Sequence, residues 1–250
     1  EYRKIKTVIL NYDHVRAKGE KLKTFGGTAS GHSSMKNMFI KICKVIEKTK
    51  HRSTTNRVKL RPIDRLDIAN IIGENVVVGG VRRTAEIVLI DQDDKECIQA
   101  KSELYKKIDE KWVIDTEIAH RQMSNNSIYY TRKPTRPELH WHLQQMRYSG
   151  EPGWVNEEAG AKRRANFQGV NPCAEILLDS KGLCNLTTVN VMGFVKDGAL
   201  DRMGLMEAQR LSARAGYRMT CTELEIPEWN AVQQRDKLLG CSLTGWQDMV

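Results

Sequence analysis

Apolar residues recur along this chain at two different spacings, and each spacing predicts one kind of element. Short β-branched or alternating runs predict strands, and apolar positions three and four apart predict helices. The expected strands cover residues 6–10, 84–90, 127–131, 176–178, 186–191 and 239–244, and the expected helices cover residues 62–78, 95–109, 136–146 and 203–219.

Strands and helices alternate in this order, which predicts βα units and a parallel sheet. The 250 residues are enough for a full core in one domain of mixed α/β type. A cluster of turn-forming residues at 148–153 is the expected loop between two subregions. The pattern therefore favours an α/β fold without internal repeats.

The charge of the chain favours polyanionic partners. Lys and Arg number 40 against 31 Asp and Glu, which gives a net charge of +9. Nucleotide phosphates and nucleic acids both suit this balance. Aromatic residues make up only 6% and no basic run is interleaved with Phe or Tyr, so nucleic acid is not favoured. No apolar run approaches the roughly 20 residues that span a bilayer, and we expect a cytoplasmic protein without a membrane partner.

Six cysteines are spread along the chain without any Cys-x-x-Cys pair, and no histidine spacing offers a third ligand. The sequence therefore predicts neither a metal site nor a secreted disulfide framework. Most of these cysteines are expected to be small buried side chains.

One stretch stands apart, because Asn171, Cys173 and Glu175 bring an amide, a thiol and a carboxylate together, and Cys184 follows eleven residues after Cys173. In an extended loop, positions i, i+2 and i+4 point the same way. A thiol that takes part in hydrogen transfer needs an acid/base partner and an orienting donor nearby. The alternative is an ordinary Asn-Pro turn with a buried cysteine.

This stretch resembles the finger loop of ribonucleotide reductases, most closely of the adenosylcobalamin-dependent kind. Further blocks resemble the same family in the same order along the chain, at residues 25–31, 75–86, 124–127, 150–153 and 243–248. The resemblance implies part of a ten-stranded α/β barrel, with the finger loop pointing inward. Residues from about 1 to 135 would form the effector-binding side, and residues from about 136 to 250 the finger-loop and active-site side.

The resemblance also implies roles in reducing ribonucleotides to 2′-deoxyribonucleotides. Cys173 would become a thiyl radical and take the 3′ hydrogen of the ribose. Glu175 would act as base toward the 3′ hydroxyl, and Asn171 would hold the sugar hydroxyls. Cys184 would be one half of a redox dithiol whose partner lies N-terminal to this sequence.

The same resemblance implies a cofactor, a reductant and an allosteric effector. Adenosylcobalamin would generate the radical and would bind mostly outside this segment, and a thioredoxin-like protein would supply electrons. The expected contacts to a deoxynucleotide effector lie in two places, a glycine-containing segment and a loop before a strand: Arg16, Lys23, Gly26, Gly27 and Ser30, then Asn125, Asn126 and Ser127.

Two alternatives remain open at this point. The first is the large subunit of an iron-dependent ribonucleotide reductase, in which the second loop cysteine lies farther from the radical cysteine. The eleven-residue interval between Cys173 and Cys184 favours the cobalamin type. The second is a nucleotide-binding regulatory module without catalysis.

Overall fold

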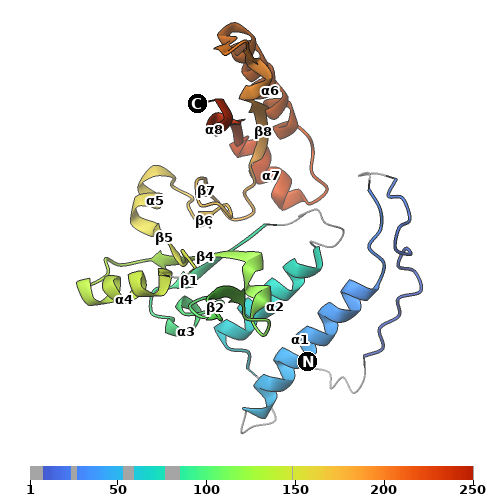
Figure 1. Cartoon of the computed structure of the whole chain (residues 1–250), viewed down its shortest axis with the longest axis vertical. Coiled ribbons are helices and arrows are strands. Elements are labelled where there is room, and N and C mark those ends of the chain that lie inside the picture. The colour runs from blue at the N-terminus through green and yellow to red at the C-terminus, as the bar shows by residue number, and fades with distance from the viewer. Residues whose placement is uncertain (1–7, 24–26, 53–58, 77–84, 148, 250) are drawn as a thin grey trace. The chain divides into compact units, whose positions relative to one another are not determined.

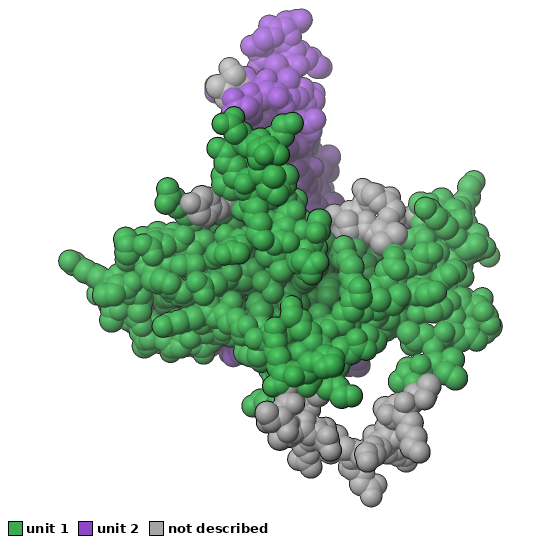
Figure 2. Space-filling view, turned by 60° about the horizontal axis from the view of Figure 1, so that its bottom comes forward, with its two compact units in different colours: residues 1–156 green, residues 157–250 purple. Residues whose placement is uncertain are grey.

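The structure is a computed structural model that describes residues 8–23, 27–52, 59–76, 85–147 and 149–249 (Figure 1). The chain divides into two compact units, residues 1–156 and residues 157–250 (Figure 2), and each is described by itself. Among the described residues, the strands form one three-stranded sheet and four two-stranded sheets, and none closes into a barrel.

The first unit is built around the three-stranded parallel sheet β1-β4-β5. Its elements are α1 (Ser33–His51), α2 (Pro62–Val76), β1 (Glu86–Asp91), α3 (Lys95–Ile98), β2 (Tyr105–Ile108), β3 (Lys111–Ile114), the 3-10 helix η1 (Ala119–Met123), β4 (Ser124–Tyr130), α4 (Arg136–Met146) and β5 (Gly153–Asn156).

The core of this unit joins α2, α3 and the sheet. Ile63 and Leu66 of α2 pack with Ile98 of α3, Ile90 of β1 and Ile128 of β4, and all five are at most 4% exposed. Truncating one such side chain to alanine typically costs about 2–5 kcal/mol. This cluster therefore fixes α2 against the sheet.

The second unit contains the parallel pair β8·β11, which α6 contacts on both strands. Its elements are α5 (Glu157–Arg163), β6 (Gly169–Val170), β7 (Leu177–Leu178), β8 (Asn185–Asn190), the 3-10 helix η2 (Val191–Phe194), β9 (Val195–Lys196), β10 (Ala199–Leu200), α6 (Arg202–Thr220), α7 (Pro227–Asp236), β11 (Leu239–Thr244) and α8 (Trp246–Met249).

The predictions of parallel strands and of most elements are confirmed. Strand β11 covers residues 239–244 as predicted, and α4 covers residues 136–146. A capping box starts α4: the Thr135 hydroxyl accepts from the Glu138 nitrogen at 3.4 Å, and the Glu138 carboxylate accepts from the Thr135 nitrogen at 2.7 Å. This local signal explains why the helix start was predictable.

Two predicted elements are wrong. The helix expected at 95–109 ends at Ile98, and the chain then forms the hairpin β2-β3 around Asp109 and Glu110, whose φ angles are 45° and 63°. Two such residues favour the type I′ turn of a hairpin over a helix. The strand expected at 6–10 is absent from residues 8–10, while residues 6 and 7 lie outside the described residues.

Candidate active site

A short hairpin in the second unit carries Cys173. Strands β6 and β7 pair antiparallel, with Val170 opposite Leu177, and the Gln168 nitrogen donates to the Leu178 carbonyl at 2.8 Å. Cys173 lies in the six-residue loop 171–176 between the two strands. The structure thus places the thiol at the tip of a hairpin, as the resemblance implies.

The loop is a tight turn and not the extended stretch that the sequence suggested. The Ala174 nitrogen donates to the Asn171 carbonyl at 2.8 Å, and Ala174 adopts a left-handed conformation with φ 65°. The side-chain oxygen of Asn171 accepts from the Ile176 nitrogen at 2.9 Å. Asn171 therefore closes the loop from both its backbone and its side chain, a use of asparagine that is common in turns.

Cys173 and Glu175 are both exposed at this tip. The resemblance implied that the tip points into a barrel, and the described residues do not enclose it. All six cysteines, Cys173 included, are free thiols. An exposed free thiol next to a carboxylate can be approached by a ligand without rearrangement of the loop.

Cys184 lies half-buried directly before β8, and its thiol donates weakly to the Asn185 carbonyl at 3.6 Å. Burial raises the pKa of the Cys184 thiol, and the negative charge of Glu175 and the neighbouring Cys241 raise it further. The structure thus brings Glu175 into electrostatic range of Cys184. A raised pKa keeps Cys184 protonated near neutral pH, as a hydrogen donor must be.

Cys241 is the nearby thiol in β11, but the strand register keeps it from pairing with Cys184. Cys241 lies opposite Thr187 in the parallel pair β8·β11. Cys184 comes three residues before Thr187, so it lies about 10 Å away along the strands. A disulfide requires Cα atoms within about 7 Å. The expected partner of Cys184 is therefore not supplied by Cys241 in this conformation.

The segment expected to bind an effector forms a compact loop in the first unit. The Gly19 nitrogen donates to the Ala29 carbonyl and the Leu22 nitrogen to the Gly27 carbonyl, both at 2.9 Å. Gly27 has φ 79°, a conformation that glycine adopts without strain. Gly26 lies outside the described residues.

Two of the expected effector residues, Arg16 and Ser30, line a pocket of about 320 Å³. The pocket is completed by residues of the same loop and of the end of α2: Val15, Leu22, Thr28, Ala29, Gly31, Asn75 and Val76. Lys23 is exposed on the same loop but is not among these lining residues.

The second expected effector segment is a strand and not a loop. Asn126 and Ser127 lie within β4 and are 3% and 5% exposed. The Asn126 nitrogen donates to the Glu151 carboxylate at 2.7 Å, and the Asn126 side chain accepts from the Ser124 hydroxyl at 2.9 Å. Asn125 is half-buried in the same strand. Burial argues against direct nucleotide contact by Asn126 and Ser127, and their effector role stays a prediction.

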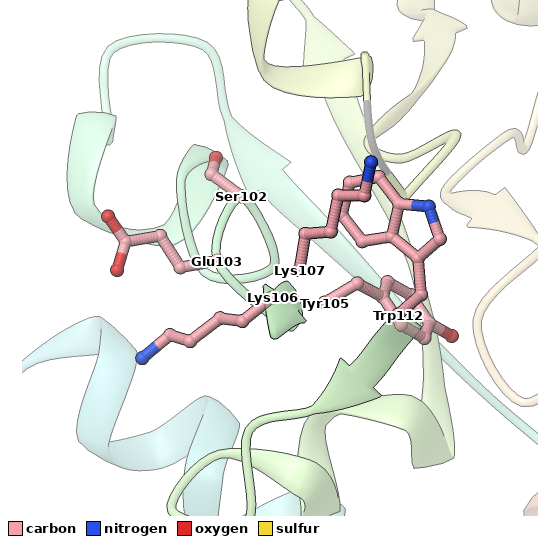
Figure 3. A pocket seen from close by; sticks show the side chains of 6 residues that line it. All are labelled: Ser102, Glu103, Tyr105, Lys106, Lys107 and Trp112. Atoms are coloured by element: carbon pink, nitrogen blue, oxygen red, sulfur yellow. The ribbon is translucent and has the colours of Figure 1, made fainter. Parts of the chain in front are cut away.

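A larger pocket of about 590 Å³ in the first unit has none of the predicted site residues in its lining (Figure 3). It is formed at the β2-β3 hairpin, where the cross-strand neighbours Lys107 and Trp112 line it together with Tyr105 and Lys106. Lys106 is already paired with Asp115 at 2.6 Å. The volume of this pocket alone does not assign a function to it.

The described residues hold no cluster of three or more metal-ligating side chains. Nor does any helix among them have the length and apolar character needed to cross a membrane.

The first 46 residues of the chain match a family described as "B12-dependent ribonucleotide reductase, insertion domain". The chain is also 30% identical over 252 residues to the adenosylcobalamin-dependent ribonucleoside-triphosphate reductase of Lactobacillus acidophilus, a match that covers 96% of this chain and 31% of the relative. The chain is related to adenosylcobalamin-dependent ribonucleotide reductases. This confirms the resemblance predicted from the sequence.

Two further reductases of the same name match to a similar degree. The protein of Lacticaseibacillus paracasei is 30% identical over 253 residues, and that of Lactobacillus leichmannii is 28% identical over 254 residues. Each match covers 96% of this chain and 31% of the relative, so the chain spans about a third of the length of these reductases. No solved structure matches the chain significantly. The resemblance found from the sequence placed the first 46 residues of the chain on an effector-binding side, and their match to an insertion domain was not predicted.

Proposed function

We propose that this chain provides the thiol-bearing hairpin of an adenosylcobalamin-dependent ribonucleotide reductase, an enzyme that converts ribonucleotides to 2′-deoxyribonucleotides. The main support for this proposal is the position of Cys173 at the tip of a loop that Asn171 closes. In addition, the charge of Glu175 acts electrostatically on Cys184. The names of the relatives support the cobalamin type over the iron-dependent alternative.

In this proposal, Cys173 loses the hydrogen atom of its thiol and the resulting sulfur radical takes the 3′ hydrogen of the ribose. Glu175 accepts the proton of the 3′ hydroxyl, which eases departure of the 2′ hydroxyl as water. Cys184 and a second thiol provide two electrons and two hydrogens, of which one completes the departing water and one replaces the 2′ hydroxyl, and they end as a disulfide. The raised pKa of Cys184 suits this step, because the thiol and not the thiolate carries a proton to give. Cys173 then returns the hydrogen that it took to the 3′ carbon.

Adenosylcobalamin, when bound, would supply the initial radical through homolysis of its cobalt–carbon bond. The free and exposed thiol of Cys173 fits this chemistry, since a hydrogen atom can be removed from it directly. We assign the residues that bind cobalamin mostly to parts of the protein beyond this segment.

The remaining features follow from the same proposal. The hairpin becomes the finger loop of a ten-stranded barrel, with residues from about 136 onward on the active-site side. The pocket beside Arg16 and Ser30 holds the phosphates of a deoxynucleotide effector, because an arginine and nearby backbone nitrogens suit an anion. A thioredoxin-like protein returns the electrons, and the enzyme acts in the cytoplasm.

The test uses the full-length protein, assayed for ribonucleotide reduction with and without adenosylcobalamin. Turnover is expected only with the cofactor. Cys173→Ser should abolish turnover while the protein stays folded, because the change removes the sulfur but little volume. With external dithiol, Cys184→Ser should permit at most about one turnover per enzyme, because the dithiol that supplies the two electrons is incomplete.

Three outcomes would contradict the proposal. Full activity of Cys173→Ser would remove the basis of the radical assignment. Activity of the wild-type protein without cobalamin would favour the iron-dependent enzyme, and effector binding without any turnover would favour the regulatory module.

A further inference from the structure

Four charged side chains of the second unit form a chain of alternating sign. Asp236 accepts hydrogen bonds from Arg164 and from Arg235, the latter at 2.7 Å. Arg235 also donates to Asp179 at 2.6 Å. The order Arg164, Asp236, Arg235, Asp179 thus alternates positive and negative charge, and we call these four residues the clamp.

The two ends of the clamp lie on the two sides of the hairpin that carries Cys173. Arg164 directly follows α5 and precedes β6, whereas Asp179 directly follows β7. The two central residues, Arg235 and Asp236, are the last residues of α7. Both stems of the hairpin are therefore tied to the same helix end.

That helix end is also bonded to the strand that follows Cys184. Lys237 ends α7 in a left-handed conformation with φ 47°, and the Leu238 carbonyl then accepts from the Asn185 nitrogen at 3.2 Å. Asn185 is the first residue of β8 and the direct neighbour of Cys184. A short run of chain thus connects to the Cys173 hairpin on one side and to Cys184 on the other.

The clamp differs from the ordinary surface ion pairs of this unit. Its Asp236, Asp179 and Arg164 side chains are 11%, 17% and 21% exposed. Hydrogen bonds from the arginines hold the pKa of both aspartates below its ordinary value, so both are charged at neutral pH. The pair Lys162–Glu158 instead joins two side chains of one helix that are 72% and 77% exposed, and such pairs contribute little.

We propose that the clamp is a positioning device, in which Arg235 and Asp236 at the end of α7 hold the Cys173 hairpin at a fixed separation from Cys184. Its effect on turnover rests on the proposed function, whereas its effect on geometry does not. Chemistry that passes between two thiols and one sugar depends on their placement, and a shift of about 1 Å can cost roughly 100-fold in rate. The four residues act through the hairpin and do not contact the reacting atoms in this proposal.

The first experiment measures geometry in the full-length protein, without any need for activity. Bifunctional thiol reagents with a series of spacer lengths are reacted with the wild type, Asp236→Asn and Asp179→Asn, and the bridged Cys173–Cys184 peptide is quantified by mass spectrometry. The wild type is expected to prefer one spacer. Both variants should lose this preference, whereas the matched control Glu158→Gln should keep it.

The second experiment measures steady-state kinetics on the same variants. Asp236→Asn should lower kcat roughly tenfold or more with KM near the wild-type value, because binding is retained while the thiols are misplaced. Asp236→Glu should restore part of kcat, since it keeps the charge. If Asp236→Asn lowers the unfolding midpoint, Arg235→Gln replaces it, because that side chain is 47% exposed.

The outcomes separate the two proposals. An unchanged spacer preference in Asp236→Asn and Asp179→Asn overturns the clamp, even if kcat falls, because the loss would then have another cause. A wild-type protein that bridges equally with every spacer overturns it as well. A full-length protein that reduces no ribonucleotide overturns the proposed function, and the bridging result still decides whether the clamp fixes the hairpin.

Discussion

The side-chain oxygen of Asn171 accepts a hydrogen bond from the backbone nitrogen of Ile176 at 2.9 Å, across the loop that carries Cys173. This bond gives Asn171 a structural task that the sequence did not suggest. The role predicted for the same residue, holding the sugar hydroxyls, calls for the amide nitrogen as a donor. The two tasks use different atoms of one side chain and can be separated by substitution.

Asn171→Ala removes both tasks, and Asn171→Asp keeps the acceptor but removes the donor. We expect Asn171→Ala to lower the free energy of unfolding by about 1 kcal/mol, the usual worth of a partly buried hydrogen bond. Asn171→Asp should stay close to the wild type in stability but lose most ribonucleotide turnover. Denaturant unfolding and the reductase assay measure the two effects. Wild-type turnover in Asn171→Asp would show that the residue serves the loop alone.

Ala174 carries the backbone strain of the same loop, with φ 65°. A β-branched side chain is disfavoured in this conformation, so Ala174→Val should cost about 1 kcal/mol or more. Ala174→Gly should change stability by less than about 0.5 kcal/mol, because relief of strain offsets the greater freedom of the unfolded chain.

The matched control is Ala199→Val, at an exposed strand position where valine is favoured. The unfolding midpoints of the three variants show whether valine is disfavoured at position 174 in particular. Equal midpoints for Ala174→Val and Ala199→Val would mean that residue 174 does not hold the left-handed conformation in solution.

Local signals account for the part of the fold that was predictable. The capping box of Thr135 and Glu138 lies at the start of α4. The apolar spacing that predicted α2 lies within that helix itself. Helix α1 carries a comparable signal, with Met35, Met38 and Ile42 three and four apart, although this helix is absent from the elements predicted from the sequence.

Long-range contacts account for most of the rest. Lys101 lies in the stretch wrongly predicted as helix, and it is buried because it pairs with Glu151 at 2.8 Å, fifty residues away. Arg164 and Asp236 of the clamp are 72 residues apart. The motif around Cys173 could be found from residue types and spacing, but which charges hold the hairpin depends on how α7 folds back onto it.

Glu175 and Cys184 allow a test of whether the loop and the strand face each other. Burial raises the pKa of Cys184 first, and the Glu175 charge raises it further. Glu175→Gln removes the charge, so the pKa of Cys184 should fall and the thiolate fraction at a given pH should rise. Alkylation of Cys184 by iodoacetamide, followed by mass spectrometry across pH, should then shift to lower pH.

The control for this shift is Glu225→Gln, another exposed carboxylate of the second unit. It should leave the alkylation profile of Cys184 unchanged. An identical profile in Glu175→Gln and the wild type would argue against electrostatic contact between the loop 171–176 and Cys184.

Asp67 in α2 gives the first unit a predicted dependence on pH. Burial raises the pKa of Asp67, but hydrogen bonds from His120 and Arg121 outweigh burial and lower the pKa to about 2 from an ordinary 3.8. Both partners belong to η1, and their bonds to the carboxylate measure 2.9 Å and 2.6 Å. These two bonds therefore hold η1 against α2, and with it the start of β4, which directly follows η1 in the chain.

The direction of this pH dependence follows from the lowered pKa of Asp67. The folded state holds the charged carboxylate more strongly than the unfolded state does, so this stabilisation is present in full above the unfolded-state pKa and is lost as pH falls toward about 2. A shift of this size corresponds to about 2 kcal/mol. Asp67→Asn should accordingly lower the free energy of unfolding at neutral pH, and the difference from the wild type should shrink between about pH 4 and pH 2.

Chemical denaturation of both proteins across this pH range measures the difference. Asp93→Asn serves as the matched control, because Asp93 also pairs with an arginine but is 71% exposed. Its effect should stay within about 0.5 kcal/mol at every pH, as expected for a surface pair. If Asp67→Asn differed from the wild type by the same amount at pH 2 and pH 7, the cost would come from lost packing or hydrogen bonding and not from the charge that joins α2 to η1.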